Sequence, residues 1–205
     1  MTSTSQPPIR ALLMDADGVV QYPRKGWLKD MLRLGGPRFI ADVFRTEKET
    51  LTGQVDLYPL VTGLLERDGR DCTADDILEV WCRIEADEYM LRLVDRVRAA
   101  GIVTALATNQ QSYRGSFMLE NLGHEAHFDH QFHSFQVGLA KPDPAYYTHI
   151  VTTLGVAPEE AVFVDDMEVN VRGAQRAGLR AVHFSATDTY GHLRCRLRAL
   201  GVPGL

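Results

Sequence analysis

Short apolar runs along the chain have the composition of strands that are buried on both faces. Four clear runs cover Ile9–Met14, Ile102–Ala107, Ala161–Val164 and Arg180–Phe184, and a weaker one lies in His130–Gln136. Short β-branched runs that end in turn or polar residues are typical of a parallel sheet with helices on both sides. We therefore expect these runs to form one parallel sheet.

Helical patterns alternate with the apolar runs. The clearest cover Leu91–Ala100, Asp143–Leu154 and Glu168–Ala177, and a glycine follows each of them. Glycine ends a helix readily because it adopts the left-handed conformation without a Cβ penalty. The alternation predicts an α/β fold with a Rossmann-like parallel sheet and helices on both of its faces.

Residues 22–89 interrupt the alternation and contain no convincing strand run. Their helical patterns cover Lys29–Leu34, Arg38–Leu51, Leu57–Asp68 and Thr73–Asp87. We predict a small inserted α-helical cap over 22–89 and a catalytic core formed by 1–21 and 90–205. We expect Gln21–Gly26 and Glu88–Met90 to act as its hinges.

The composition indicates one domain with a substantial apolar core and no strongly charged surface. The 205 residues are 45% apolar and 24% charged, and the net charge is −5. This balance lacks the basic surface of a nucleic-acid-binding protein, so we expect no nucleic-acid partner. No apolar run reaches the roughly 20 residues that span a bilayer, so we expect no membrane association.

The N-terminus and the cysteines favour a cytoplasmic location. Residues 1–8 lack the basic start and apolar stretch of a signal peptide, and we expect a disordered lead-in there. Cys72, Cys82 and Cys195 form an odd, loosely spaced set that suits a reducing compartment. The sequence does not distinguish a monomer from a homodimer.

Polar residues follow three of the predicted strands at the points where the strands end. In chain order these pairs are Asp15 and Asp17, Thr108 and Asn109, and Asp165 and Asp166. Because the carboxyl ends of parallel strands meet at one sheet edge, we expect the pairs to converge on one site. Carboxylates gathered there would repel one another, and a hard, oxygen-liganded cation such as Mg²⁺ would remove that repulsion. Lys141 precedes a proline and a predicted helix and can neutralise a further charge.

Each of these pieces has a simpler explanation when it is taken alone. Asp-x-Asp-Gly is common in surface turns, and Thr-Asn after a strand is usually a cap. Asp165 and Asp166 could cap a helix, and Lys141 could lie in a solvated loop. The order and the strand context of all the pieces together favour a common site.

The combined motifs resemble those of the haloacid dehalogenase superfamily. The corresponding segments are Leu-Leu-Met-Asp15-Ala-Asp17-Gly-Val, Ala-Thr108-Asn109, Lys141-Pro-Asp-Pro and Val-Phe-Val-Asp165-Asp166. The resemblance covers essentially the whole core and implies the fold of that superfamily. The insertion resembles the helical cap of the subgroup that includes β-phosphoglucomutase, phosphoglycolate phosphatase and sugar-phosphate phosphatases.

The resemblance implies phosphoryl transfer to a carboxylate. It assigns Asp15 as nucleophile, Asp17 as general acid and base, and Lys141 as a stabiliser of transition-state charge. The further catalytic or substrate contacts that it implies are Thr108, Asn109 and Gly18.

The resemblance also implies a set of Mg²⁺ ligands. These are Asp15, the backbone carbonyl of Asp17, and Asp166. Asp165 would hold Lys141 in place, and Asn170 would support the ligands from outside. Asp165 and Asp166 could exchange these roles, and the sequence leaves that choice open.

The implied function is a Mg²⁺-dependent phosphatase that hydrolyses a small organic phosphate monoester through an aspartyl phosphate. The partner would be a small phosphorylated metabolite, with sugar phosphates among the candidates. A phosphomutase of the β-phosphoglucomutase type is an alternative, and a non-catalytic binding protein on the same fold is a third. The acid at Asp17 argues against a dehalogenase, since carbon–halogen cleavage needs no protonated leaving group.

A histidine repeat looks like a metal-binding cluster. It consists of His124, His127, His130 and His133. A three-residue repeat drifts around a helix, so one shared face is not expected. We expect a solvated loop with some ring packing.

Residues just after the first motif are candidate substrate contacts near the mouth of the site. They are Tyr22, Arg24, Lys25 and Trp27.

Overall fold

A five-stranded parallel sheet forms the centre of the computed structural model, which describes residues 7–205. Its strand order is β5–β4–β1–β6–β7. The strands are β1 (Ala11–Met14), β4 (Val103–Thr108), β5 (His130–His133), β6 (Ala161–Asp165) and β7 (Arg180–His183). All five predicted runs are strands of this sheet, and the predicted α/β fold is confirmed. The lead-in expected over 1–8 lies largely outside the described residues.

The central strand β1 explains why its sequence is uninterruptedly apolar. It pairs with β4 on one side and β6 on the other, and every residue of it is buried. Leu12 and Leu13 point to opposite faces and belong to separate apolar clusters. Since all strands are parallel, the residues after β1, β4 and β6 emerge at the same edge.

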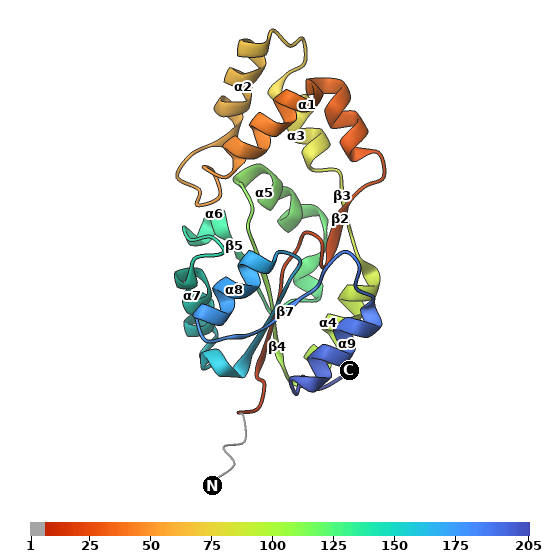
Figure 1. Ribbon diagram of the computed structural model, residues 1–205, viewed down its shortest axis with the longest axis vertical. Helices are drawn as coiled ribbons and strands as arrows, with labels where there is room; N and C mark the ends of the chain where they lie inside the picture. Colours follow the sequence, from red (N-terminus) through yellow and green to blue (C-terminus); the bar gives the residue numbers. More distant parts are fainter. Residues whose placement is uncertain (1–6) are drawn as a thin grey trace.

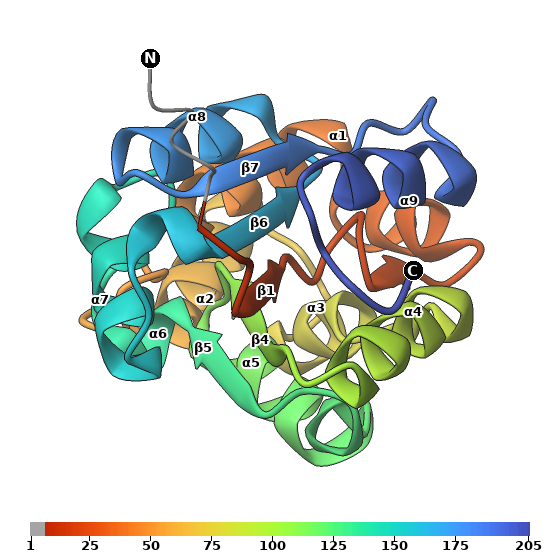
Figure 2. The same cartoon turned by 90° about the horizontal axis from the view of Figure 1, so that it is seen from below.

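Helices cover both faces of the sheet, as Figure 2 shows. One face carries α4 (Glu88–Ala99), α5 (Ser112–Asn121) and α9 (Tyr190–Ala199), and the other carries α7 (Pro144–Leu154) and α8 (Glu168–Arg176). The short elements are α6 (Ser134–Val137) and the 3₁₀ turns η1 (His124–Ala126) and η2 (Pro158–Glu160). Within residues 7–205, no helix combines the length and the apolar character needed to cross a membrane.

Three helices form a second lobe beyond the carboxyl ends of the strands (Figure 1). They are α1 (Trp27–Glu47), α2 (Leu57–Asp68) and α3 (Ala74–Trp81). They bury an apolar cluster of their own around Phe39, Val61 and Ile77. All three lie within the predicted cap. Gly36 breaks α1, because its φ of 74° and ψ of 168° lie outside the helical region. The two helical patterns expected at the start of the cap are therefore the two arms of α1, and the second arm ends at Glu47.

Two short strands connect the lobes, so the expectation of no strand over 22–89 is wrong. They are β2 (Gln21–Pro23) and β3 (Ile84–Ala86), which pair antiparallel. The helix expected up to Asp87 ends at Trp81 instead. The physical reason is that Ile84 is buried in the apolar cluster of the core, which an extended backbone permits.

The second predicted hinge, Glu88–Met90, is helical. It forms the first turn of α4, and the side chain of Asp87 caps that turn by accepting from the Met90 N–H at 3.0 Å. The second predicted hinge therefore coincides with the capped start of a helix.

Candidate active site

Asp15 follows the central strand directly and stands at the carboxyl edge of the sheet. Its Oδ1 accepts from the Lys141 ammonium at 2.7 Å and from the backbone N–H of Ala16 at 2.7 Å. Burial raises the pKa of Asp15 well above its ordinary value, while Lys141 acts in the opposite direction. An added cation would therefore favour the ionised form that a nucleophile requires.

Lys141 bridges two carboxylates from neighbouring strands. Its Nζ lies 2.7 Å from Asp15 and 2.7 Å from Asp165, and its side chain is 1% exposed. The side-chain amide of Asn109 donates to the Lys141 carbonyl and accepts from the Lys141 N–H, both at 2.9 Å. Asn109, which the resemblance implied as a substrate contact, therefore fixes the backbone of Lys141 and also lines the cavity that contains Asp15.

The structure distinguishes Asp165 from Asp166. Asp165 is fully buried, and besides Lys141 it accepts from the Met167 N–H at 2.7 Å and from the Asn170 amide at 3.0 and 3.1 Å. Asp166 is half-buried and lines the cavity that contains Asp15. Burial and the neighbouring Asp165 raise the pKa of Asp166. Asp165 is thus occupied by donors, whereas Asp166 opens onto the site.

Gly18 gives Asp166 the room to reach the site. Its φ is 74°, and a Cβ at this position would lie 2.5 Å from Oδ2 of Asp166. A side chain at position 18 would therefore be strained and would displace the carboxylate. The structure places Gly18, which the resemblance implied as a substrate contact, beside a candidate metal ligand.

The acidic cluster has the chemistry of a site for a hard divalent cation. One carboxylate oxygen from each of Asp15, Asp165 and Asp166 lies within 4.8 Å of the others. Because Asp165 is occupied by Lys141, Asn170 and Met167, the carboxylates available to a cation are Asp15 and Asp166. Oxygen ligands of this kind fit Mg²⁺.

Asp17 is held by side chains of the core. Both terminal nitrogens of Arg114 contact its carboxylate, Nη1 at Oδ2 and Nη2 at Oδ1, the latter at 2.6 Å. Gln110 donates to it at 2.7 Å and Gln21 at 3.0 Å. Burial alone would raise the pKa of Asp17, but the ion pair with Arg114 and these hydrogen bonds lower it overall.

Thr108 belongs to the network around Asp17. It is buried at the end of β4, and its hydroxyl accepts from the Gln110 amide at 3.1 Å. The same Gln110 amide donates to Asp17. The predicted hydroxyl is therefore at the site and is connected there to the predicted acid.

Sequence reasoning missed Gln21, Gln110 and Arg114. An arginine in a helical pattern reads as a surface charge, yet Arg114 is only 7% exposed. One signal was present, because Gln110 and Arg114 lie four residues apart directly after the second motif, at the spacing of neighbours on a helix. They also contact each other at 2.9 Å.

Two adjoining cavities meet at Asp17. The first, of about 620 Å³, contains Asp15, Lys141 and Asp166. The second, of about 500 Å³, lies between the edge of the sheet and the three-helix lobe. The residues lining both are Asp17, Lys48, Leu51 and Asn109. A ligand in one cavity can therefore extend into the other.

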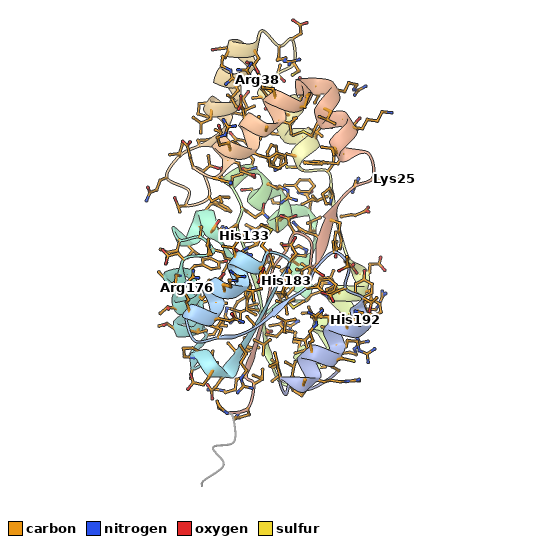
Figure 3. The ribbon with its side chains drawn as sticks, in the orientation of Figure 1. Lys25, Arg38, His133, Arg176, His183 and His192 are labelled. Atoms are coloured by element: carbon orange, nitrogen blue, oxygen red, sulfur yellow. The ribbon has the colours of Figure 1, made fainter. Side chains whose placement is uncertain are left out.

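The histidine repeat does not form the solvated loop that we expected. His124 and His133 are completely buried, and burial lowers the pKa of each to about 4. His133 lies at the carboxyl end of β5 (Figure 3). His127 pairs with Asp95 at 2.8 Å, and His130 is exposed. The segment passes from η1 into β5, and the first and last rings of the repeat are buried while the two between them reach the surface.

The four candidate contacts after the first motif separate in space. Trp27 lines the second cavity, whereas Arg24 lines a different one beside α3. Tyr22 donates to the Gly18 carbonyl at 3.0 Å. Lys25 lies at the outer edge of the turn that leads into α1 (Figure 3). Of the four, Trp27 is placed at the joined cavities.

Comparison with known proteins gives a family match over most of the chain. Residues 9–178 match the haloacid dehalogenase-like hydrolase family. Over 88% of this chain, the sequence is 26% identical to bifunctional epoxide hydrolase 2 of Sus scrofa. Over 42% of this chain, it is 41% identical to the phosphoserine phosphatase of Thermus thermophilus. The matches cover only 37% and 34% of these relatives.

Solved structures of the same fold cover nearly the whole chain. A haloacid dehalogenase family enzyme from Bacteroides thetaiotaomicron, in complex with magnesium and inorganic phosphate, superposes with a TM-score of 0.77. It is 23% identical and covers 90% of this chain and 98% of its own. At that identity the likeness establishes the fold. Taken with the match over residues 9–178, it shows that this chain belongs to the haloacid dehalogenase-like hydrolases.

Proposed function

We propose that this hydrolase is a Mg²⁺-dependent phosphatase that acts on a small phosphorylated metabolite through an aspartyl phosphate at Asp15. The observation that carries the proposal is the buried carboxylate of Asp15, paired with Lys141 and next to Asp166 at the sheet edge. The phosphatase among the relatives and the structural neighbour with bound magnesium and phosphate support it.

Mg²⁺ would be held by Asp15, Asp166 and the backbone carbonyl of Asp17. When bound, it would neutralise charge on the phosphoryl oxygens. Asp165 and Asn170 would keep Lys141 in place, since both carboxylate oxygens of Asp165 are already hydrogen-bonded. Gly18 would leave the space that Asp166 needs.

Asp15 would perform the first transfer. One carboxylate oxygen forms a bond to phosphorus while the bond from phosphorus to the leaving oxygen breaks, and that oxygen takes a proton from Asp17. Lys141 compensates the charge that develops on the phosphoryl group. The products of this step are the free alcohol and an aspartyl phosphate.

Water would complete the reaction. It attacks phosphorus, its proton passes to Asp17, and the bond between phosphorus and Asp15 breaks to release inorganic phosphate. The donors on Asp17 favour its ionised form, which suits a base in this half-reaction. Before the first step Asp17 must instead hold a proton.

We also propose that the cap, residues 22–89, sets substrate choice while the core, residues 1–21 and 90–205, performs the chemistry. Arg114 links the two, because its Nε donates to the Trp81 carbonyl of the cap at 3.2 Å while its other nitrogens hold Asp17. A movement of the cap about the β2–β3 ribbon would therefore reach the acid directly.

Hydrolysis of p-nitrophenyl phosphate tests the proposal. We expect Mg²⁺-dependent release of inorganic phosphate that stops with EDTA and returns with Mg²⁺. Asp15→Asn should abolish it while leaving the folded state intact, since an amide is nearly isosteric but a poor nucleophile. Full turnover by the chelated protein or by Asp15→Asn would refute the proposal.

A further inference from the structure

The structure assigns the second cavity as the leaving-group pocket and points to an alcohol with an aromatic ring as its occupant. This inference rests on the proposed phosphatase function. The cavity adjoins the first one at Asp17, where the leaving oxygen would receive its proton. The phosphoryl group would lie against Asp15, and the organic part would extend past Asp17 into the second cavity.

Aromatic side chains of the cap form the wall of this pocket. Trp27, Phe44 and Trp81 all line it. The ring centroid of Phe44 lies 6.1 Å from that of Trp27 and 4.9 Å from that of Trp81, so the three rings form one continuous surface. Pro23 and Leu51 add apolar surface. Aromatic rings favour another ring in an offset or edge-to-face arrangement.

Most polar groups of the pocket are already paired with the protein. Arg114 and Gln110 both bond to Asp17, and the side chain of Asn109 is bonded to Lys141. Lys48 is exposed and lines both cavities. Burial raises the pKa of Glu47 to about 7, so about half of this carboxyl is protonated at pH 7.

This distribution disfavours a polyhydroxy leaving group. Each hydroxyl taken from water into an apolar pocket needs a hydrogen-bonding partner, and few groups here are uncommitted. An aromatic ring needs no such partners and gains from burial against the three side chains. The volume of about 500 Å³ lies within the range of pockets for small organic ligands.

Phosphate esters of primary alcohols test this inference, because all of them release a primary alkoxide oxygen and they differ only in the organic group attached to it. We would compare 2-phenylethyl phosphate, ethyl phosphate and glycerol 1-phosphate. We expect kcat/KM for 2-phenylethyl phosphate to exceed the other two by at least about tenfold. Equal values for all three, in an enzyme that hydrolyses p-nitrophenyl phosphate, would overturn the inference and leave the phosphatase function intact.

Two variants on α1 test whether the preference for an aromatic leaving group arises in this pocket. Phe44→Ser should reduce the preference for 2-phenylethyl over ethyl phosphate about tenfold. Leu32→Ser is the matched control, since Leu32 and Phe44 lie on α1 and are each 39% exposed, but Leu32 does not line the cavity. The control should keep the wild-type preference. An unchanged preference in Phe44→Ser would overturn the inference.

Fluorescence provides a readout that does not depend on turnover. The chain contains two tryptophans, and both line this pocket. With Mg²⁺ present, benzylphosphonate should change their emission saturably, and Phe44→Ser should weaken its binding about tenfold. Methylphosphonate should bind much more weakly. If both phosphonates bind equally well, the inferred preference for an aromatic group is wrong. If the protein prefers benzylphosphonate but hydrolyses no phosphate ester, the phosphatase function is refuted and the inferred preference of the pocket stands.

Discussion

Arg114 donates hydrogen bonds from both terminal nitrogens of its guanidinium to the carboxylate of Asp17, and its Nε donates to the backbone carbonyl of Trp81 in the three-helix lobe. Both side chains lie between the cap and the sheet edge, and Arg114 is only 7% exposed. A two-nitrogen contact of this kind fixes orientation as well as charge. The orientation of the Asp17 carboxylate is therefore set by a residue outside the recognised motifs.

Replacing Arg114 should impair substrates that need a proton donor most. In Arg114→Met, we expect kcat/KM to fall at least about tenfold more for ethyl phosphate than for p-nitrophenyl phosphate. Nitrophenolate leaves without protonation, whereas an alkoxide requires the correctly placed Asp17. Removing Arg114 would also favour the protonated form of Asp17, and we expect the loss of orientation to outweigh this effect. Arg172→Met, which removes an exposed partner of Glu168, is the control. Equal losses on both substrates would assign Arg114 a purely structural role.

Substitutions of the two neighbouring aspartates should have different effects, one on metal binding and the other on the stability of the fold. Asp166→Asn is expected to abolish Mg²⁺ binding in calorimetry with little change in the free energy of unfolding, because Asp166 is half-buried and open to the site. Asp165→Asn should lower that free energy by about 3 kcal/mol, since it leaves the buried Lys141 partly unpaired. The reverse pattern would exchange the roles of the two residues.

Gly18→Ala should weaken Mg²⁺ binding at least about tenfold, because the new Cβ would lie 2.5 Å from Oδ2 of Asp166. Gly26→Ala is its control. Gly26 also has a positive φ, of 90°, but no atom lies within 4 Å of the Cβ position. Backbone strain is thus common to both variants and displacement of the ligand is not. Equal Mg²⁺ affinities in the two variants would contradict this account of Gly18.

The buried histidines should make the protein sensitive to mild acid. Burial lowers the pKa of His124 and His133 from 6.5 to about 4, so the unfolded chain binds more protons than the folded one between these values. The free energy of unfolding should therefore fall as the pH falls from about 6.5 to 4, by roughly 1–2 kcal/mol per histidine at pH 5.

Urea denaturation at pH 7 and pH 5 measures this dependence. Among the described residues, neither ring nitrogen of His124 has a hydrogen-bond partner, so His124→Phe should fold well and show a smaller difference between the two pH values. The exposed His130 provides the control, and His130→Gln should match the wild type. A wild-type difference retained in His124→Phe would contradict the assignment.

The sheet and its edge could be predicted because their signals are local. Each buried strand is a short apolar run, and Asp15, Thr108 and Asp165 follow three such runs directly. Parallel pairing then determines which residues meet. The β2–β3 ribbon was not predictable in this way, because three-residue strands carry little periodic signal and their pairing joins residues far apart in the chain.

The hydrogen-bonding partners of the predicted site residues also could not be predicted from the sequence. The contact between Asp17 and Arg114 spans 97 positions. Lys141 and Asn109 are bound through backbone atoms, which no residue pattern encodes. The burial of His124 and His133 depends on tertiary packing, and a repeat in polar surroundings gave no sign of it.

Trapping the covalent intermediate tests the central claim most directly. The protein would be mixed with Mg²⁺ and p-nitrophenyl phosphate, quenched in acid during turnover and reduced with borohydride, which converts an aspartyl phosphate to homoserine. Peptide mass spectrometry then locates the change. We predict homoserine at position 15 and at no other aspartate, and none in Asp15→Asn. Turnover with an unmodified Asp15, or with the label on another residue, would contradict the account.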